Sequence, residues 1–365
     1  MTTFDSTPDS VAGGTAPHVL CAGDRFITAA SLAEAARSAF GPGTRAVEYR
    51  TSWPDVPFGA VDGVREASGD PAELAALAAD SEVVLTHLAP ITRAVFEAAP
   101  SLKVVGVTRG GPVNVDLAAA TEHGVPVVFL PGRNLGAVAE FVVGLMVTLP
   151  RSVGVASREL AAGRWDARYF RFELTGLELR AATVGLVGLG AVGSRVAELL
   201  RGFGSRVLAY DPYATPEAAD KAGVDLVPLP TLYATSDIVS AHARLTDDTR
   251  KMFGAEAFAA MKPGAHFINT ARGELVDQAA LLAALESGHL AGAALDVFDP
   301  EPPDPADPLL SRPDVILTPH LAGASRQVAL ESVERVTAEV AGFLHSGVLD
   351  HCANPQWQDH GRHRT

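Results

Sequence analysis

The chain has 365 residues, of which 47% are hydrophobic, so it can bury the cores of one or two globular domains and is not intrinsically disordered. Its net charge of −14, without a local cluster of Lys and Arg, argues against nucleic acid and membranes as partners. Two cysteines, Cys21 and Cys352, are too few for a disulfide framework or a cysteine zinc site, which indicates a reducing compartment, and we expect a cytoplasmic protein.

The first part of the chain is expected to alternate strands and helices. Residues 1–17 have neither the basic start nor the apolar run of a signal peptide, so we expect a flexible N-terminal arm. Short β-branched runs then alternate with Ala- and Leu-rich stretches of helical period, which is typical of parallel βαβ units. The predicted strands are residues 19–22, 83–86, 104–107 and 125–130, and the predicted helices include residues 31–40 and 71–79.

A strongly apolar helix is predicted in the middle of the chain, over residues 134–149. Its sequence NLGAVAEFVVGLMVTL leaves almost no polar face, so the helix must be covered on most sides. It is too short for a membrane span and carries Glu140 in its middle. We therefore expect it to pack between domains or subunits.

A second series of strands begins after Arg180, which predicts an α/β protein with two sheets. An amphipathic helix over residues 325–347 follows the last strand, and residues 351–365 form a polar tail. Three histidines in this tail invite a metal site, but we favour a flexible tail and predict no metal. The strands of the second series are residues 183–187, 206–210, 238–241, 266–269, 292–297 and 315–318, and the tail histidines are His351, His360 and His363.

A glycine-rich turn follows the first strand of the second series. The stretch TVGLVGLGAVG contains the pattern G-x-G-x-x-G, opens a predicted helix over residues 191–203, and precedes a strand that ends in an acidic residue about 20 residues further on. Glycines allow a tight turn, the helix N-terminus attracts pyrophosphate, and the carboxylate accepts hydrogen bonds from ribose. Because the whole unit is present, we favour a dinucleotide site over a turn without a ligand. Its residues are Gly188, Gly190, Gly193 and Asp211.

The same carboxylate bears on the choice of cofactor. Asp211 repels a 2′-phosphate, which favours NAD over NADP. Two arginines, Arg206 and Arg244, leave NADP open as the alternative cofactor.

Polar residues follow three later strands. Arg272 lies in HFINTARGE, Asp296 and Glu301 lie in LDVFDPEP, and His320 lies in ILTPHLAG. Ligands bind outside the carboxyl ends of the strands in a doubly wound sheet, so these groups are expected beside the nicotinamide. An arginine can bind a substrate carboxylate, a histidine can transfer a proton, and an acid can stabilise the imidazolium. Each group alone suits a structural role, but together they predict hydride transfer to a 2-oxo acid.

The stretches TVGLVGLGAVG…YDP, FINTARGELVDQAAL, LDVFDPEPP and TPHLAGAS resemble the D-isomer-specific 2-hydroxyacid dehydrogenases in order and spacing. The resemblance implies that Arg272 binds the substrate carboxylate and carbonyl, and that His320 donates the proton during reduction. It also implies that Glu301 raises the pKa of His320. On the cofactor side, it assigns the nicotinamide end to Ala271 and Asp296 and the pyrophosphate to Ala191 and Val192.

The resemblance also implies the domain organisation. A Rossmann NAD-binding domain, residues 132–321, is expected to be inserted into a flavodoxin-like substrate domain formed by residues 18–131 and 322–350. In the segment VTRGGPVNVD, the backbone amides of Gly110 and Gly111 would hold the substrate carboxylate. The family also implies a homodimer.

One residue of the first part and three departures from the family pattern bear on substrate and cofactor choice. His87, in THLAPIT, is expected either to touch the substrate's side chain or to serve in helix capping or packing. Pro112 stands where the substrate loop commonly continues with glycine, and Arg244 stands where proline is usual. Ala181 and Ala182 replace the usual Gly-Lys. None of these departures falls on the three predicted catalytic residues.

We therefore predict an NAD-dependent enzyme that interconverts a 2-oxo acid, for example glyoxylate or hydroxypyruvate, and its D-2-hydroxy acid. Two alternatives stay open. The first is an NADH-sensing interaction protein on the same scaffold, since a fold does not fix its use. The second is a dehydrogenase of the formate or phosphite type, which TPHLAGAS and Glu301 disfavour.

Overall fold

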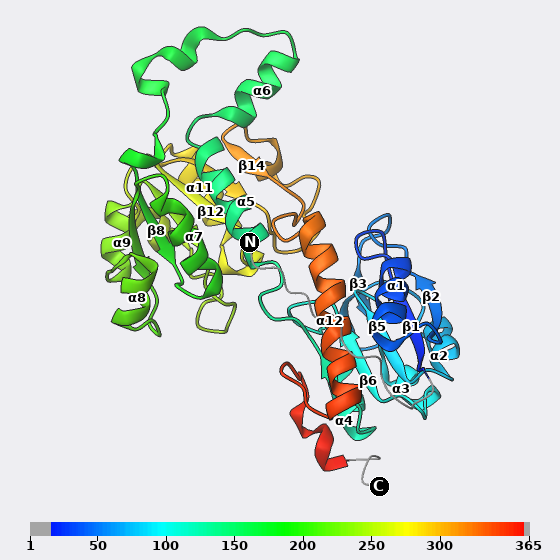
Figure 1. Ribbon diagram of the computed structural model, residues 1–365. Helices are drawn as coiled ribbons and strands as arrows, with labels where there is room; N and C mark the ends of the chain where they lie inside the picture. The colour runs from blue at the N-terminus through cyan, green and yellow to red at the C-terminus, as the bar shows by residue number, and fades with distance from the viewer. Residues whose placement is uncertain (1–15, 361–365) are drawn as a thin grey trace. The chain divides into compact units, whose positions relative to one another are not determined.

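The computed structural model describes residues 16–360, so the arm expected over residues 1–17 lies almost wholly outside the described residues, as does His363. The chain divides into two compact units (Figure 1). Unit 1 comprises Met1–Arg133 and Ser325–Thr365, and unit 2 comprises Asn134–Ala324. The chain passes from one unit to the other between residues 133 and 134 and again between residues 324 and 325. These boundaries lie two and three residues, respectively, beyond those expected from the sequence, at 131/132 and 321/322.

Unit 1 is built on a parallel sheet with the strand order β2-β1-β5-β6-β7. Counting only these five strands, the order is 2-1-3-4-5, which is the flavodoxin-like order. Its strands are β1 (His18–Gly23), β2 (Arg45–Arg50), β5 (Val83–Thr86), β6 (Val104–Val107) and β7 (Val127–Val128), and β3 (Gly59–Val61) with β4 (Val64–Ala67) forms a separate antiparallel hairpin. Its helices are α1 (Ala29–Phe40), α2 (Pro71–Ala78), α3 (Arg93–Ala98), α4 (Leu117–Glu122) and α12 (Arg326–Ser346).

Unit 2 is built on a seven-stranded parallel sheet with the order β10-β9-β8-β11-β12-β13-β14. This order places the first strand of the series, β8, in the middle, as in a Rossmann fold, and reverses between β8 and β11. Its strands are β8 (Thr183–Val187), β9 (Arg206–Tyr210), β10 (Asp225–Leu226), β11 (Ile238–Ala241), β12 (Ala265–Asn269), β13 (Leu290–Leu295) and β14 (Val315–Leu317). Its helices are α5 (Leu135–Thr148), α6 (Val153–Ala161), α7 (Ala191–Arg201), α8 (Pro216–Ala222), α9 (Leu229–Thr235), α10 (Ala255–Ala260) and α11 (Gln278–Glu286).

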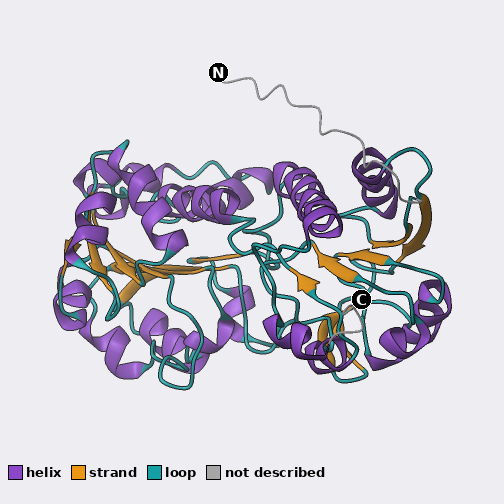
Figure 2. Cartoon of the chain, turned by 60° about the horizontal axis from the view of Figure 1, so that its bottom comes forward, coloured by secondary structure: helices purple, strands orange, loops and turns teal. Residues whose placement is uncertain are grey.

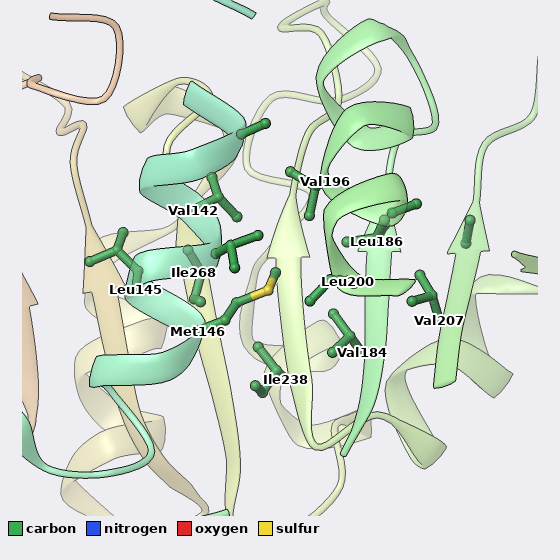
Figure 3. Packing of buried hydrophobic residues seen from close by; sticks show 14 of the residues in the cluster. Val142, Leu145, Met146, Val184, Leu186, Val196, Leu200, Val207, Ile238 and Ile268 are labelled. Carbon is green, nitrogen blue, oxygen red and sulfur yellow. The ribbon is translucent and has the colours of Figure 1, made fainter. Parts of the chain in front are cut away.

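Both sheets carry helices on their two faces, which confirms the α/β fold class (Figure 2). The central strands are buried on both sides because βαβ crossovers place helices over each face, and β5, with the sequence VVLT, is buried along its whole length. The apolar helix α5 packs with α7 on one face of the unit 2 sheet, where Val142 and Met146 lie among strand residues (Figure 3). Its other side carries the exposed residues Glu140 and Val147.

Three expectations about elements were wrong. β7 is only two residues long, and β2, β10 and the β3–β4 hairpin had no counterpart among the predicted strands. The polar tail is ordered through residue 360: Asn354 is buried, accepts a hydrogen bond from Val127 N (2.9 Å) and donates to Val125 O (3.0 Å). Trp357 packs edge-on against Phe343 of α12. The polar segment after α12 thus packs at the β7 edge of the sheet through the side-chain amide of Asn354. Hydrophobic periodicity does not reveal a contact of this kind.

Among the described residues, no single helix has the length and hydropathy of a membrane span. Only α5 and α6 taken together meet the criterion of length and composition, and they form a pair bent by 69°.

Candidate active site

The three predicted catalytic residues all follow strands that are neighbours in the unit 2 sheet. β12, β13 and β14 lie side by side and run parallel, so their carboxyl ends meet at one edge. Arg272 follows β12, Glu301 follows β13 and His320 follows β14. Parallel topology therefore brings these three groups together from positions that are far apart in the sequence.

His320 and Glu301 form a hydrogen-bonded pair at this edge. His320 Nδ1 lies 2.9 Å from Glu301 Oε2, and Glu301 Oε1 accepts a hydrogen bond from Phe298 N (3.0 Å). The hydrogen bond to Glu301 raises the pKa of His320, against the effect of burial. Burial acts to raise the pKa of Glu301, but the hydrogen bond and charge of His320 outweigh it and lower that pKa. The imidazole remains 45% exposed, and its Nε2 is the ring nitrogen left for a ligand.

Asp296 holds the loop that carries His320. Its carboxylate accepts hydrogen bonds from Thr318 Oγ1 (2.6 Å), Leu321 N (2.7 Å) and Ala322 N (2.8 Å). His320 itself has a φ of 55°, a left-handed conformation that costs a non-glycine residue about 1 kcal/mol. The Asp296 side chain thus fixes a strained backbone. Asp296 has no exposed surface in this structure, and its contact with the nicotinamide remains a prediction.

A buried amide and a glycine position Arg272. Asn269 Oδ1 accepts a hydrogen bond from Ala271 N (3.0 Å), and Asn269 Nδ2 donates to Arg272 O (2.8 Å). A Cβ at Gly273 would lie 2.0 Å from the carbonyl carbon of Phe298, so only glycine fits where the two loops cross. Arg272 is exposed, and its charge acts on both Glu301 and His320. Asn269 and Gly273 were not among the predicted site residues, although both lie within the motif FINTARGE.

The glycines of the turn after β8 have three different surroundings. Gly188 has a φ of 105°, and a Cβ there would lie 2.7 Å from the carbonyl carbon of His242. At Gly193, a Cβ would lie 2.2 Å from the carbonyl oxygen of Gly188. At Gly190, a Cβ would meet no atom within 4 Å. Gly188 and Gly193 therefore allow the tight turn and helix packing, and Gly190 faces open space that a pyrophosphate fits.

The start of α7 and the end of β9 complete the cofactor residues. No side chain caps α7, and the first intrahelical bond runs from Ser194 N to Gly190 O (2.9 Å), so the amides of Ala191 and Val192 precede it. Uncapped amides at a helix N-terminus suit an anion. Asp211 Oδ2 accepts a hydrogen bond from Leu189 N (2.8 Å), which joins the glycine turn to the end of β9. These residues fit a dinucleotide.

His242, which the sequence arguments did not single out, lies with its backbone against Gly188 of the glycine turn. Its Nε2 lies 2.9 Å from Ser240 Oγ, and burial lowers the pKa of His242 to about 4, so the ring is neutral. The position of His242 directly after the buried strand β11 was the feature of the sequence that could have identified it.

In unit 1, His87 is a buried packing residue that is also hydrogen-bonded. Its Nδ1 lies 2.6 Å from Asp24 Oδ2, and its ring lies 5.7 Å from both Phe26 and Trp53. Burial lowers the pKa of His87, against the effect of Asp24. The other predicted substrate residues, Gly110 and Gly111, lie in an open loop where a Cβ would meet at most one atom within 4 Å.

Two further features concern binding sites elsewhere. A cavity of about 300 Å³ in unit 2 is lined by Tyr169, His266, Ala291 and Asp314, which lie at the amino ends of β12, β13 and β14 or in the segment over them. It is therefore at the opposite edge of the sheet from His320. Among residues 16–360, no three His, Cys, Asp or Glu side chains are grouped so that they could hold a metal.

Comparisons with known proteins agree with this geometry. Residues 143–322 match the model of the "D-isomer specific 2-hydroxyacid dehydrogenase, NAD binding domain". The chain is 38% identical to glyoxylate reductase of Korarchaeum cryptofilum over 267 residues, which is 73% of this chain and 80% of that protein. It is 39% identical to D-3-phosphoglycerate dehydrogenase of Archaeoglobus fulgidus over 257 residues, which is 70% of this chain and 48% of that protein.

The chain thus spans about half the length of several phosphoglycerate dehydrogenases that it matches. Among solved structures, D-2-hydroxyisocaproate dehydrogenase is similar with a TM-score of 0.78 and 26% identity, over 92% of this chain and 99% of that chain. The likeness extends over both units.

Proposed function

Because the chain belongs to the D-isomer-specific 2-hydroxyacid dehydrogenase family and has its NAD-binding domain, we propose that it interconverts a 2-oxo acid and its D-2-hydroxy acid. The observation that carries the proposal is the hydrogen bond of 2.9 Å between His320 and Glu301, beside Arg272 and in the same unit as the glycine turn. NAD(H), when bound, supplies or accepts the hydride.

The catalytic groups divide the remaining work. Arg272 binds the substrate carboxylate and polarises the carbonyl with its planar guanidinium. His320 donates a proton from Nε2 to the carbonyl oxygen during reduction and takes it back during oxidation. Glu301 stabilises the protonated imidazole through Nδ1, and Asp296 keeps the His320 loop in place.

The substrate class is a small 2-oxo or 2-hydroxy acid. Relatives are named for different acids, glyoxylate and 3-phosphoglycerate among them, so family membership leaves the substituent at C2 open. The amides of Gly110 and Gly111 are proposed to bind the common carboxylate. The cytoplasmic location expected from the sequence stays a prediction.

A homodimer is also proposed. The residues 162–178, here called the aromatic segment, expose Trp165, Phe170 and Phe172, each by more than 80%. Figure 1 shows this segment and α6 extending away from the sheet of unit 2. Exposed apolar clusters of this kind mark interaction surfaces, and a second copy of the chain would cover them.

The assay that tests the function follows NADH absorbance with glyoxylate, hydroxypyruvate, pyruvate, bulkier 2-oxo acids, formate and phosphite. We expect turnover of at least one 2-oxo acid with a D-product. His320→Ala should lower kcat by about 100-fold or more with NADH binding retained. Arg272→Ala should raise KM and lower kcat.

The matched control is His345→Ala, since His345 is exposed at the end of α12. Normal turnover by His320→Ala would refute the catalytic assignment. A flat trace across the panel, with NADH still bound, would favour an NADH-sensing protein instead.

A further inference from the structure

The hairpin of β3 and β4 lies against the loop of residues 109–114, here called the 109–114 loop. Arg65 N, in β4, donates a hydrogen bond to Val113 O (2.9 Å). The Arg109 guanidinium donates from Nη1 to Glu66 O (3.1 Å) and forms an ion pair with the Glu66 carboxylate through Nη2. The hairpin therefore contacts the loop near both of its ends.

The middle of the 109–114 loop leaves two backbone amides without a protein partner. Among the residues that the structure describes, the N–H groups of Gly110 and Gly111 donate no hydrogen bond. Successive backbone N–H groups that are not paired within the protein suit an anion. These are the amides proposed above to bind the substrate carboxylate, so the conformation of the loop decides whether both of them point at one anion.

Glu66 holds Arg109 from an unusual backbone conformation. The φ of Glu66 is 47°, in the left-handed region that residues with a side chain rarely adopt. In this conformation the same residue presents both its carbonyl oxygen and its carboxylate to one guanidinium. Such conformations persist only where surrounding contacts stabilise them, and they gather at functional sites. The contact between Glu66 and Arg109 therefore points to a role beyond closing the hairpin.

Arg109 is fixed through its backbone as well as its side chain. Leu130 N donates a hydrogen bond to Arg109 O (2.7 Å). Glu66 engages both terminal nitrogens of the guanidinium, and the side chain of Arg109 is only 16% exposed. These contacts favour a positioning role for Arg109 over a direct contact with a substrate anion, which would need terminal nitrogens that face solvent.

We propose that Glu66 and Arg109 are positioning residues, which together set the conformation of the 109–114 loop for substrate binding. The inference rests on the proposed function and adds residues whose contacts all lie within unit 1. The loop would bind the carboxylate equally well before and during the reaction. Loss of the contact should therefore weaken substrate binding and leave the chemical step unchanged.

The kinetic test uses Glu66→Gln, Arg109→Met and the double variant, with the best 2-oxo acid found in the NADH assay. Each single variant should raise KM by about fivefold or more and change kcat by less than about twofold. The double variant should raise KM no further than the larger single effect, because the two residues act through one contact. A raised KM in Arg109→Met with an unaltered or lowered KM in Glu66→Gln would overturn the proposal, since Arg109 would then contact the substrate itself.

Three further variants guard against a general loss of the fold. Glu66→Gly removes the carboxylate, but glycine adopts a φ of 47° without strain, so the hairpin backbone should stay intact while KM rises as in Glu66→Gln. Arg109→Lys keeps the charge and should recover part of the lost affinity. Arg65→Gln is the matched control on the same hairpin, because its side chain is exposed and the N–H that binds Val113 is retained, so KM should not change.

Hydrogen exchange measured by mass spectrometry separates this inference from the proposed function, because it needs no substrate. In Glu66→Gln and Glu66→Gly, the peptide that covers residues 108–116 should exchange faster than in the wild type, whereas the strands of unit 1 should exchange at the wild-type rate. Faster exchange confined to this peptide supports the positioning role even if no acid of the panel is reduced. Wild-type exchange of this peptide in both variants would overturn the inference even if the wild type reduces 2-oxo acids.

Discussion

At the scale of single residues, the candidate site separates the groups with a proposed chemical role from the groups that hold them in place. His320 and Arg272 are exposed, whereas Asp296 and Asn269 are fully buried. The side chains of Asn269 and Asp296 form hydrogen bonds with the backbone of the loops that carry Arg272 and His320. Exposed side chains can therefore keep one geometry without being buried themselves.

Glu301→Gln is expected to shift the pH profile of the reaction. The hydrogen bond from Glu301 raises the pKa of His320, so His320 stays protonated to a higher pH than a free imidazole. Reduction needs the protonated form and falls as the pH rises through this raised pKa. In the variant the fall should begin at a lower pH, and oxidation, which needs neutral His320, should extend to a lower pH.

The measurement is kcat/KM against pH in both directions. Glu256→Gln, an exposed change on α10, is the control and should leave both profiles unchanged. An unaltered alkaline limb in a Glu301→Gln protein that still binds NADH would show that Glu301 does not govern the protonation of His320.

Alanine substitutions at Gly190 and Gly193 are expected to fail in different ways. A methyl group at position 190 meets no protein atom within 4 Å, so the protein should fold normally and lose NADH affinity by about tenfold or more, because the methyl occupies the pyrophosphate space. A methyl group at position 193 lies 2.2 Å from Gly188 O and should destabilise unit 2 by roughly 1–3 kcal/mol. Thermal unfolding and fluorescence titration with NADH distinguish the two. Wild-type NADH affinity in Gly190→Ala would contradict the assignment.

At the scale of elements, the candidate site residues lie at strand ends and in loops, whereas helices and strands together form the core. α5 and α7 pack their apolar sides on the unit 2 sheet, and the glycine turn and the Arg272 and His320 loops emerge from strand ends. The exception is α6 with the aromatic segment, in which α6 buries none of its residues. A helix that buries none of its residues within its own unit leaves apolar surface that another partner can cover.

Phe170→Ser combined with Phe172→Ser is expected to weaken the proposed homodimer. Both side chains are more than 80% exposed in the single chain, so their loss should leave the fold of the chain intact. Light scattering coupled to size-exclusion chromatography should show a dimer for the wild type and a larger share of monomer for the variant. Val348→Ser, an exposed change in unit 1, is the control. A monomeric wild type would remove the proposal.

At the scale of the whole molecule, buried neutral histidines link stability to pH. Burial lowers the pKa of His242 to about 4 and also lowers the pKa of His266 and of His87. The first two lie in unit 2 and the third in unit 1. Each ring is held neutral in the folded state at a pH where an unfolded chain protonates it.

Acid is therefore expected to destabilise both units before the carboxylates titrate. The stability contributed by neutral His242 is present above pH of about 6.5 and is lost as the pH falls from there toward 4, because only the unfolded state takes up the proton in that window. For His242 the loss is roughly 1.4 kcal/mol per pH unit within that window.

Urea unfolding between pH 7 and 4.5 measures this slope. His242→Asn should flatten it, and His345→Gln should leave it unchanged because His345 is exposed. Equal slopes in the wild type and His242→Asn would count against a neutral buried ring.

The sequence by itself determined which polar groups follow the strands at the carboxyl edge of the unit 2 sheet. The glycine turn, Asp211 and the groups after β12, β13 and β14 lie in short motifs of fixed spacing, and parallel strands bring their carboxyl ends to one edge whatever the details of packing. Fold class, NAD-binding domain and family could therefore be predicted from local patterns.

Only the tertiary structure decided the polar contacts between distant segments. The contacts of Asp24 with His87, of Asn354 with Val127 and of Arg133 with Ser332 depend on which chain segments become neighbours in space. Hydrophobic periodicity reports which faces are buried, but it does not report which polar side chains meet there, because a hydrogen bond requires only proximity and leaves no repeat in the sequence.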